Sequence, residues 1–133
     1  MKLHADRHDD LNAFTAYGDD WVEVNGERHS GALLVRPRGP VDVWDVASFE
    51  ALNAERLLAL LDAPADQPDW RPEVILLGTG AQLRFPHPQL TRPLLQAGVG
   101  VESMDTLAAC RTYNILMAEG RQVLAALLDT GLR

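Results

Sequence analysis

The sequence contains little cysteine and fewer basic than acidic residues. Cys110 is the one cysteine among 133 residues, which excludes an intrachain disulfide and a cysteine-rich zinc site. Lysine and arginine number 12 against 19 aspartate and glutamate residues, so the formal charge is −7. Nucleic acids and anionic lipid surfaces are bound by clustered basic side chains, and this balance therefore argues against both kinds of partner.

Long apolar runs are also missing. No stretch approaches the roughly 18 consecutive apolar residues of a membrane-spanning helix, and the first ten residues lack the apolar region of a secretory signal. We therefore expect no membrane insertion and a cytoplasmic protein, where a single thiol stays reduced. Hydrophobic residues make up 47% of the chain and charged residues 23%. This composition predicts a single domain over residues 1–133, with residues 1–10 as a flexible N-terminal segment.

The first third of the chain predicts short antiparallel strands. Asn25-Gly26 separates two strand-like runs, and this dipeptide favours a type I′ hairpin turn because both central residues need a positive φ. Two further short runs cover residues 32–35 and 41–44. The pattern indicates a β-rich N-terminal portion, in which residues 41–44 form an edge strand.

From residue 53 onward, helix-like and strand-like segments alternate. Apolar residues at helical spacing predict helices over residues 54–61, 88–97 and 107–119. Strands are predicted at residues 74–77, 99–104 and 122–128. The fold class that follows is α/β: a three-layer domain with a central mixed β-sheet, packed helices and the β-rich N-terminal portion. The last helix is apolar almost all round, so we expect it to be well buried.

Several stretches of the second half resemble one known family. They run from Leu76 to Gly80, Phe85 to Pro88, Gly98 to Thr106, Ala108 to Leu116 and Glu119 to Arg121. They are similar to the family of the mitochondrial respiratory complex I assembly factor three, whose members are small α/β proteins. The resemblance implies a three-layer fold and no established catalytic activity. Because the N-terminus is too acidic for a mitochondrial presequence, the chain looks like a bacterial member, to which the mitochondrial role does not transfer automatically.

One set of residues is a candidate for lining a ligand pocket. In open α/β sheets, ligands bind at the carboxyl ends of the strands, and two predicted strands end beside small or polar residues. The set comprises Gly78, Thr79, Gly80, Asp105, Thr106, Tyr113 and Asn114. Each member also has a purely structural interpretation, which we favour: a tight turn for the glycines, an N-cap for Asp105 or Thr106, and buried packing for Tyr113 and Asn114.

Other chemically capable residues have simple structural explanations. The sequence pattern places no histidine next to Cys110. We therefore favour a buried, unreactive thiol over a nucleophile. His4 and His8, with the acidic residues beside them, are better explained as terminal polar residues than as metal ligands. His87 is expected in a loop or at an N-cap. The three tryptophans either fill the core or anchor a partner. We therefore predict no catalytic residue, no metal site and no cofactor.

The leading functional hypothesis is a non-enzymatic binding or assembly-type module that acts through a protein partner, similar to respiratory complex I assembly factors. The alternative is a small-ligand binder or an enzyme that uses a pocket at the carboxyl ends of the central strands. A homo-oligomeric structural protein is a third reading, based only on apolar content. The sequence identifies neither the partner nor the oligomeric state.

Overall fold

The computed structural model describes residues 10–129. The predicted flexible segment at residues 1–10 therefore lies outside the described range, except for its last residue. The strands are β1 Phe14–Tyr17, β2 Val22–Val24, β3 Glu27–His29, β4 Leu33–Val35, β5 Asp42–Val43, β6 Val74–Thr79, β7 Gly100–Met104 and β8 Val123–Asp129. The helices are α1 Ala54–Leu58, α2 Pro88–Gln96 and α3 Thr106–Ala118, with short 3-10 turns at Phe49–Ala51 and Ala59–Leu61.

The strands form two sheets. The first is antiparallel, in the order β1-β2-β3, and the second has the order β5-β4-β8-β6-β7. In the second sheet β6 runs parallel to both β7 and β8, whereas β4 is antiparallel to β5 and β8. The central sheet is therefore mixed, as predicted. The run at residues 41–44 contributes β5, which lies at one edge of this sheet and so confirms the expected edge strand.

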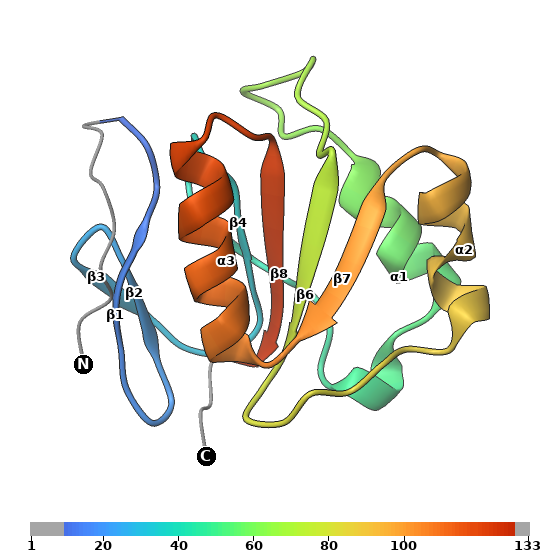
Figure 1. The fold of residues 1–133 in the computed structure, drawn as a ribbon, viewed down its shortest axis with the longest axis horizontal. Helices are drawn as coiled ribbons and strands as arrows, with labels where there is room; N and C mark the ends of the chain where they lie inside the picture. Colours follow the sequence, from blue (N-terminus) through green and yellow to red (C-terminus); the bar gives the residue numbers. More distant parts are fainter. Residues whose placement is uncertain (1–9, 130–133) are drawn as a thin grey trace.

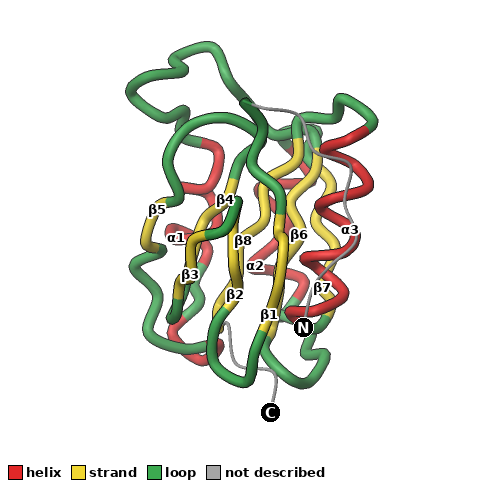
Figure 2. The backbone as a smooth tube through the Cα atoms, turned by 90° about the vertical axis from the view of Figure 1, so that its left-hand side faces the viewer, coloured by secondary structure: helices red, strands yellow, loops and turns green. Residues whose placement is uncertain are grey.

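The elements pack in three layers (Figures 1 and 2). Helix α3 lies on one face of the five-stranded sheet, and α1 and α2 cover the opposite face. The small β1-β2-β3 sheet lies beside α3, on the side of β4. The predicted fold class, a three-layer α/β domain with a mixed central sheet and a β-rich N-terminal portion, is confirmed.

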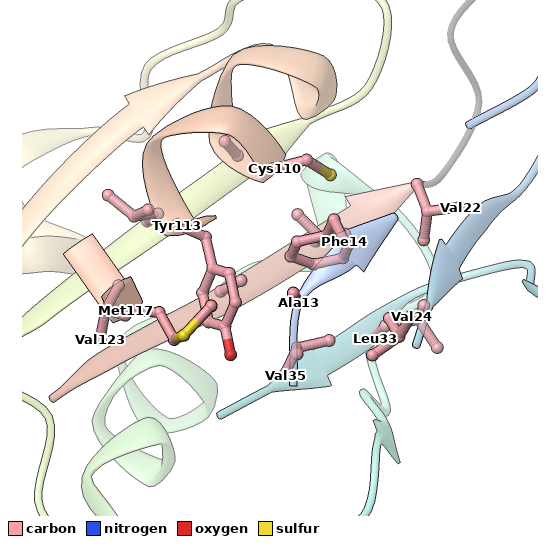
Figure 3. Packing of buried hydrophobic residues seen from close by; sticks show 14 residues of the cluster. Ala13, Phe14, Val22, Val24, Leu33, Val35, Cys110, Tyr113, Met117 and Val123 are labelled. Carbon is pink, nitrogen blue, oxygen red and sulfur yellow. The ribbon is translucent and has the colours of Figure 1, made fainter. Parts of the chain in front are cut away.

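Two apolar cores lie between these layers. The core under α3 joins the small sheet to the central one, and there the rings of Phe14 and Tyr113 meet edge to face with their centroids 5.1 Å apart (Figure 3). The second core lies between the central sheet and the α1–α2 layer, and it includes Ile75, Leu77 and Leu94. Successive β6 side chains enter opposite cores, which explains why the β6 sequence is continuously apolar.

Local sequence signals produce the turns and helix ends. Asn25 and Gly26 have φ angles of 51° and 87°, so the hairpin between β2 and β3 has the predicted positive-φ turn. The Asn53 side chain accepts a hydrogen bond from the backbone N–H of Arg56 and caps α1. Pro88 occupies the first turn of α2, where its missing N–H leaves no bond unmade.

The expectation that the last helix is well buried holds for only one side of α3. One stripe of α3 faces the core, including Cys110, Tyr113 and Met117. The side chain of Ile115 points away from this stripe and is 61% exposed. The physical reason is that a helix lying on a single sheet face buries only the side that contacts it, and no described element covers the outer side.

Candidate functional site

The ends of β6 and β8 meet the start of α3 through one hydroxyl group. The Thr106 hydroxyl accepts a hydrogen bond from the Gly80 N–H at 2.9 Å and donates one to the Asp129 carbonyl at 2.6 Å. The Thr106 N–H in turn donates to the Gly80 carbonyl at 2.8 Å. Thr106 thus joins two strand ends to a helix start, and its polar atoms are used within the chain.

The neighbouring predicted residues also bond to backbone. The Asp105 carboxylate accepts a hydrogen bond from the Ala108 N–H at 2.9 Å, so it is the N-cap of α3. The Thr79 hydroxyl donates to the Gln82 carbonyl at 2.7 Å and accepts from the Arg84 N–H at 3.1 Å. These bonds hold the turn that follows β6 in place.

Tyr113 and Asn114 face a different part of the molecule. The Asn114 side chain accepts from the Phe14 N–H at 2.9 Å and donates to the Phe14 carbonyl at 2.8 Å. The Tyr113 hydroxyl donates to the Asn12 carbonyl at 3.0 Å. The predicted set therefore divides into a group at the strand ends and a pair that fastens β1 to α3. Ligand binding by this set stays a prediction.

Cys110 lies on the same buried stripe of α3. Burial raises the pKa of its thiol to about 12, with a smaller contribution from the nearby Asp105 charge. Burial also raises the pKa of the Tyr113 hydroxyl. A thiol with such a pKa is protonated at neutral pH, and the thiolate is the reactive nucleophile. Cys110 is therefore a buried residue of the core under α3.

The remaining sequence candidates have ordinary roles where they are described. The His87 ring accepts a hydrogen bond from the Gln89 N–H and caps α2. Trp44 is buried in the core, and Trp21 and Trp70 are half-buried. His4, His8 and Asp9 lie outside the described residues. Within residues 10–129, no three His, Cys, Asp or Glu side chains gather in a way that could hold a metal ion.

A cavity of about 370 Å³ opens at the carboxyl ends of β6 and β8. Thr79 lines it, together with residues from the segment that leads into α1. Arg84, Glu50 and Phe49 also line this cavity. The Arg84 guanidinium pairs with the Glu50 carboxylate at 2.8 Å and lies 4.0 Å from the centre of the Phe49 ring. The hydrogen bond from Arg84 lowers the pKa of Glu50. Neither Glu50 nor Arg84 is in the predicted set, because their pairing depends on tertiary structure.

A second hollow of about 620 Å³ lies along the outer edge of β7. Figure 1 shows this strand beside α2. We call it the β7 groove. Its lining residues are Phe85, Pro86, His87, Pro88, Thr91, Val101, Glu102 and Ser103. Phe85 is 72% exposed although it is a large aromatic residue. An exposed aromatic side chain next to an open sheet edge is a feature of interaction surfaces.

Sequence reasoning did not select the β7 groove as a site. The segment from Phe85 to Pro88 belongs to the motifs that carry the family resemblance, but its exposure is not a property of the local pattern. An aromatic residue in a loop, followed by two prolines, is the one local signal that could have drawn attention to it.

Comparison with known proteins defines the family. Residues 14–128 match the family described as "Protein of unknown function (DUF498/DUF598)". The chain belongs to this family. A relative in Xenopus tropicalis, named NADH dehydrogenase [ubiquinone] 1 alpha subcomplex assembly factor 3, is 33% identical over 113 residues, which cover 84% of this chain and 58% of the relative. The chain thus spans a little over half the length of the assembly factors that it matches.

Solved structures of similar proteins have the same fold. A crystal structure of a Bordetella parapertussis protein is 48% identical, with a TM-score of 0.81 over 92% of this chain and 99% of that one. A solution structure from Bordetella pertussis, described as a Mth938-like domain, is 45% identical, with a TM-score of 0.78 over 98% of this chain and 94% of that one. No helix within residues 10–129 has the length and apolar character that crossing a membrane requires.

Proposed function

We propose that this protein is a non-enzymatic binding module with an assembly role, and that it acts through a protein partner at the β7 groove. The observation that carries the proposal is the 72% exposure of Phe85 beside an open sheet edge. The names of the curated relatives support it, because they describe an assembly factor.

Aromatic side chains contribute much of the energy of protein interfaces, because they bury a large area at a small cost in conformational entropy. Pro86 and Pro88 flank His87 and restrict the backbone next to Phe85. A restricted loop loses little freedom on binding, so more of the contact energy appears as affinity.

The proposal includes a cytoplasmic location. The support is that the single cysteine of the sequence is a free thiol, which fits a reducing compartment. The net charge of −7 supports a partner that is a protein rather than a nucleic acid.

Two matched substitutions test this function. Phe85 and Val43 are both exposed apolar residues, 72% and 82% exposed, near opposite edges of the central sheet. Tagged wild-type protein, Phe85→Glu and Val43→Glu are expressed in the source cells, and co-purified proteins are quantified by mass spectrometry. We expect a stoichiometric partner with the wild type and Val43→Glu, and at least a tenfold loss with Phe85→Glu. Thermal unfolding confirms that both variants fold.

Equal recovery of the partner with Phe85→Glu and wild type would exclude the β7 groove as the binding surface. Absence of any stoichiometric protein with all three chains would contradict the partner hypothesis itself. These outcomes do not involve the identity of the partner.

A small-ligand function is the second candidate, and the cavity beside Thr79 favours it. The cavity contains a paired cation and anion, Arg84 and Glu50, with the Phe49 ring against the cation. Native mass spectrometry of protein purified from its source cells tests for a bound small molecule. A mass increment that is lost in Thr79→Val supports this candidate, and an unmodified mass in every preparation contradicts it.

A further inference from the structure

The outer edge of β7 presents free backbone groups. Among residues 10–129 no strand pairs with this edge. The backbone groups of successive strand residues point to alternate sides. The Gly100 N–H donates to a carbonyl just before β6, and the Met104 carbonyl lies 3.2 Å from the Thr79 hydroxyl, so both ends of β7 face β6. The alternation therefore directs the N–H and C=O groups of Val101 and Ser103 outward.

The side chains of β7 divide between the two faces of the sheet. Val101 packs against the core that α1 and α2 cover, so Glu102 points to the α3 face. Glu102 is exposed and lines the β7 groove. No cationic side chain in the described part of the chain forms an ion pair with it. An isolated carboxylate thus lies between the two residues whose backbone groups are open.

We propose that the outer edge of β7 receives an extended segment of a different protein as an added antiparallel strand, with Lys or Arg opposite Glu102 and an apolar residue on each side of it. This inference rests on the proposed function and specifies how the partner binds. The added strand would extend the five-stranded sheet to six and satisfy the open groups of Val101 and Ser103.

Hydrogen-bond geometry determines which side chains face each other. In an antiparallel pair, residues whose backbone groups point at each other exchange two hydrogen bonds, and the pairs between them bring their side chains closer. Val101 and Ser103 would occupy the hydrogen-bonded positions, beside Phe85 and Thr91 of the groove. Glu102 would occupy the closer position between them, where an opposite charge on the partner gains most.

The same geometry disfavours a second copy of this chain. Antiparallel pairing of two β7 strands over all five residues places Glu102 directly opposite the Glu102 of the other copy. Like charges directly opposite each other destabilise a strand pair, and each copy also carries a net charge of −7. The charge pattern therefore complements a basic segment of another protein.

Selection from a random heptapeptide phage library tests the inference. The library is selected in parallel on the folded wild-type chain, on Glu102→Lys and on Glu27→Lys. Glu27 is an exposed acidic residue of β3, an outer strand of the small sheet, so it is a matched control. On wild type and Glu27→Lys we expect peptides with Lys or Arg between two apolar residues. On Glu102→Lys we expect Asp or Glu at the same central position.

The best wild-type peptide is then synthesised and titrated by NMR. The charge reversal Glu102→Lys should weaken its binding about fivefold or more. N-methylation of either flanking apolar residue should weaken it about tenfold, because the methyl group removes a hydrogen bond to the edge, whereas N-methylation of the central basic residue should change it less than about twofold, because that N–H points away. Amide exchange should slow at Val101 and Ser103 but not at Glu102.

Three results would overturn strand addition: no enriched peptide, the same peptides on wild type and Glu102→Lys, or equal effects of N-methylation at all positions. If a cellular partner is lost in Phe85→Glu while any of these results holds, the proposed function stands and the added strand is excluded. If Phe85→Glu retains the cellular partner while the selected peptides and their N-methylated forms give the expected results, strand addition stands. The proposed cellular function at this groove is then excluded.

Discussion

At the residue level, Asn114 makes a contact that links the two halves of the sequence. Its amide accepts from and donates to the backbone of Phe14, 100 positions earlier. Both backbone groups are buried there, and a buried polar group without a partner destabilises a protein by about 1–3 kcal/mol. Asn114 therefore holds β1 in place more specifically than an apolar residue could.

We predict that Asn114→Ala lowers the free energy of unfolding by about 2–4 kcal/mol, because two buried backbone groups lose their partner. Urea unfolding followed by circular dichroism measures this. Ile115→Ala is the control, since the neighbouring Ile115 is 61% exposed and surface substitutions change stability by only about 0.5 kcal/mol. Equal stability losses in the two variants would mean that the Asn114 bonds contribute nothing specific.

The second residue-level prediction concerns pH. Burial raises the pKa of Cys110 from its ordinary value of 9.0 to about 12 in the folded chain. The unfolded chain thus releases this proton first as the pH rises. The stabilising contribution of the protonated thiol is fully present below about pH 9 and is lost progressively between pH 9 and 12.

Comparison with Cys110→Ala isolates this effect, because Tyr113 titrates in both chains. We expect the stability advantage of the wild type over Cys110→Ala to shrink by about 1–2 kcal/mol between pH 8 and pH 10. Urea unfolding at a series of pH values measures the difference. A difference that stays constant over this range would show that the thiol is not protected from ionisation by the fold.

At the element level, the close contact of α3 with the central sheet depends on Gly78. A Cβ added to Gly78 would lie 2.6 Å from the Leu127 Cδ2 and 3.4 Å from the Ala109 Cβ. Gly78 and Leu127 are opposite residues of β6 and β8. The absence of a side chain at Gly78 therefore leaves room for the Leu127 side chain under α3.

We predict that Gly78→Ala destabilises the chain by about 1–3 kcal/mol through overpacking. Leu127→Val alone should cost about 1 kcal/mol, since it removes one buried methylene group. The double variant should be less destabilised than the sum of the two, because the shorter side chain makes room for the new methyl group. A double-mutant cycle from urea unfolding measures this coupling. Strict additivity would contradict the proposed crowding between these two positions.

At the level of the whole molecule, both sheets share one core. Phe14 and Val22 of the small sheet pack in the same cluster as Leu33 and Ala125 of the central sheet. Separation of the two sheets would expose this apolar surface to water. The prediction of a single domain therefore has a specific thermodynamic consequence.

We expect residues 10–129 to unfold as one cooperative unit. Native-state hydrogen exchange should give the slowest amides of β2 and of β6 the same opening free energy, within about 1 kcal/mol, because global unfolding exposes both. The amide of Arg38, in an exposed loop, is the internal control for local opening. Opening of β2 several kcal/mol below β6 would show that the small sheet is an independent unit.

The open edge of β7 has a consequence for association. A charged residue on an edge strand prevents edge-to-edge pairing between copies. We predict that the sedimentation coefficient of Glu102→Val rises with protein concentration. That of Glu27→Val should stay as in the wild type, because the exposed Arg28 keeps the β3 edge charged. Sedimentation velocity over a range of concentrations measures both. Identical behaviour of Glu102→Val and wild type would indicate that this charge does not protect the edge.

Most of the secondary structure was predictable from the sequence because its signals are local. The Asn25-Gly26 turn, the Asn53 cap and the Pro88 helix start each depend on a few neighbouring residues and on backbone sterics. The N-cap role of Asp105 was also among the sequence interpretations. The partner of Asn114 was not, because a hydrogen bond to β1 joins residues 100 positions apart and leaves no periodic trace.

The sequence by itself determined the element types, the α/β class, the family likeness and the acidic, single-cysteine character of this protein. Only the tertiary structure decided the strand order, and with it which strand has an open edge. Strand order depends on how distant segments share a core, and a local pattern does not encode it. The position of Glu102 on the outer strand follows from that order. The exposure of Phe85 and the pairing of Arg84 with Glu50 depend on how distant loop segments pack.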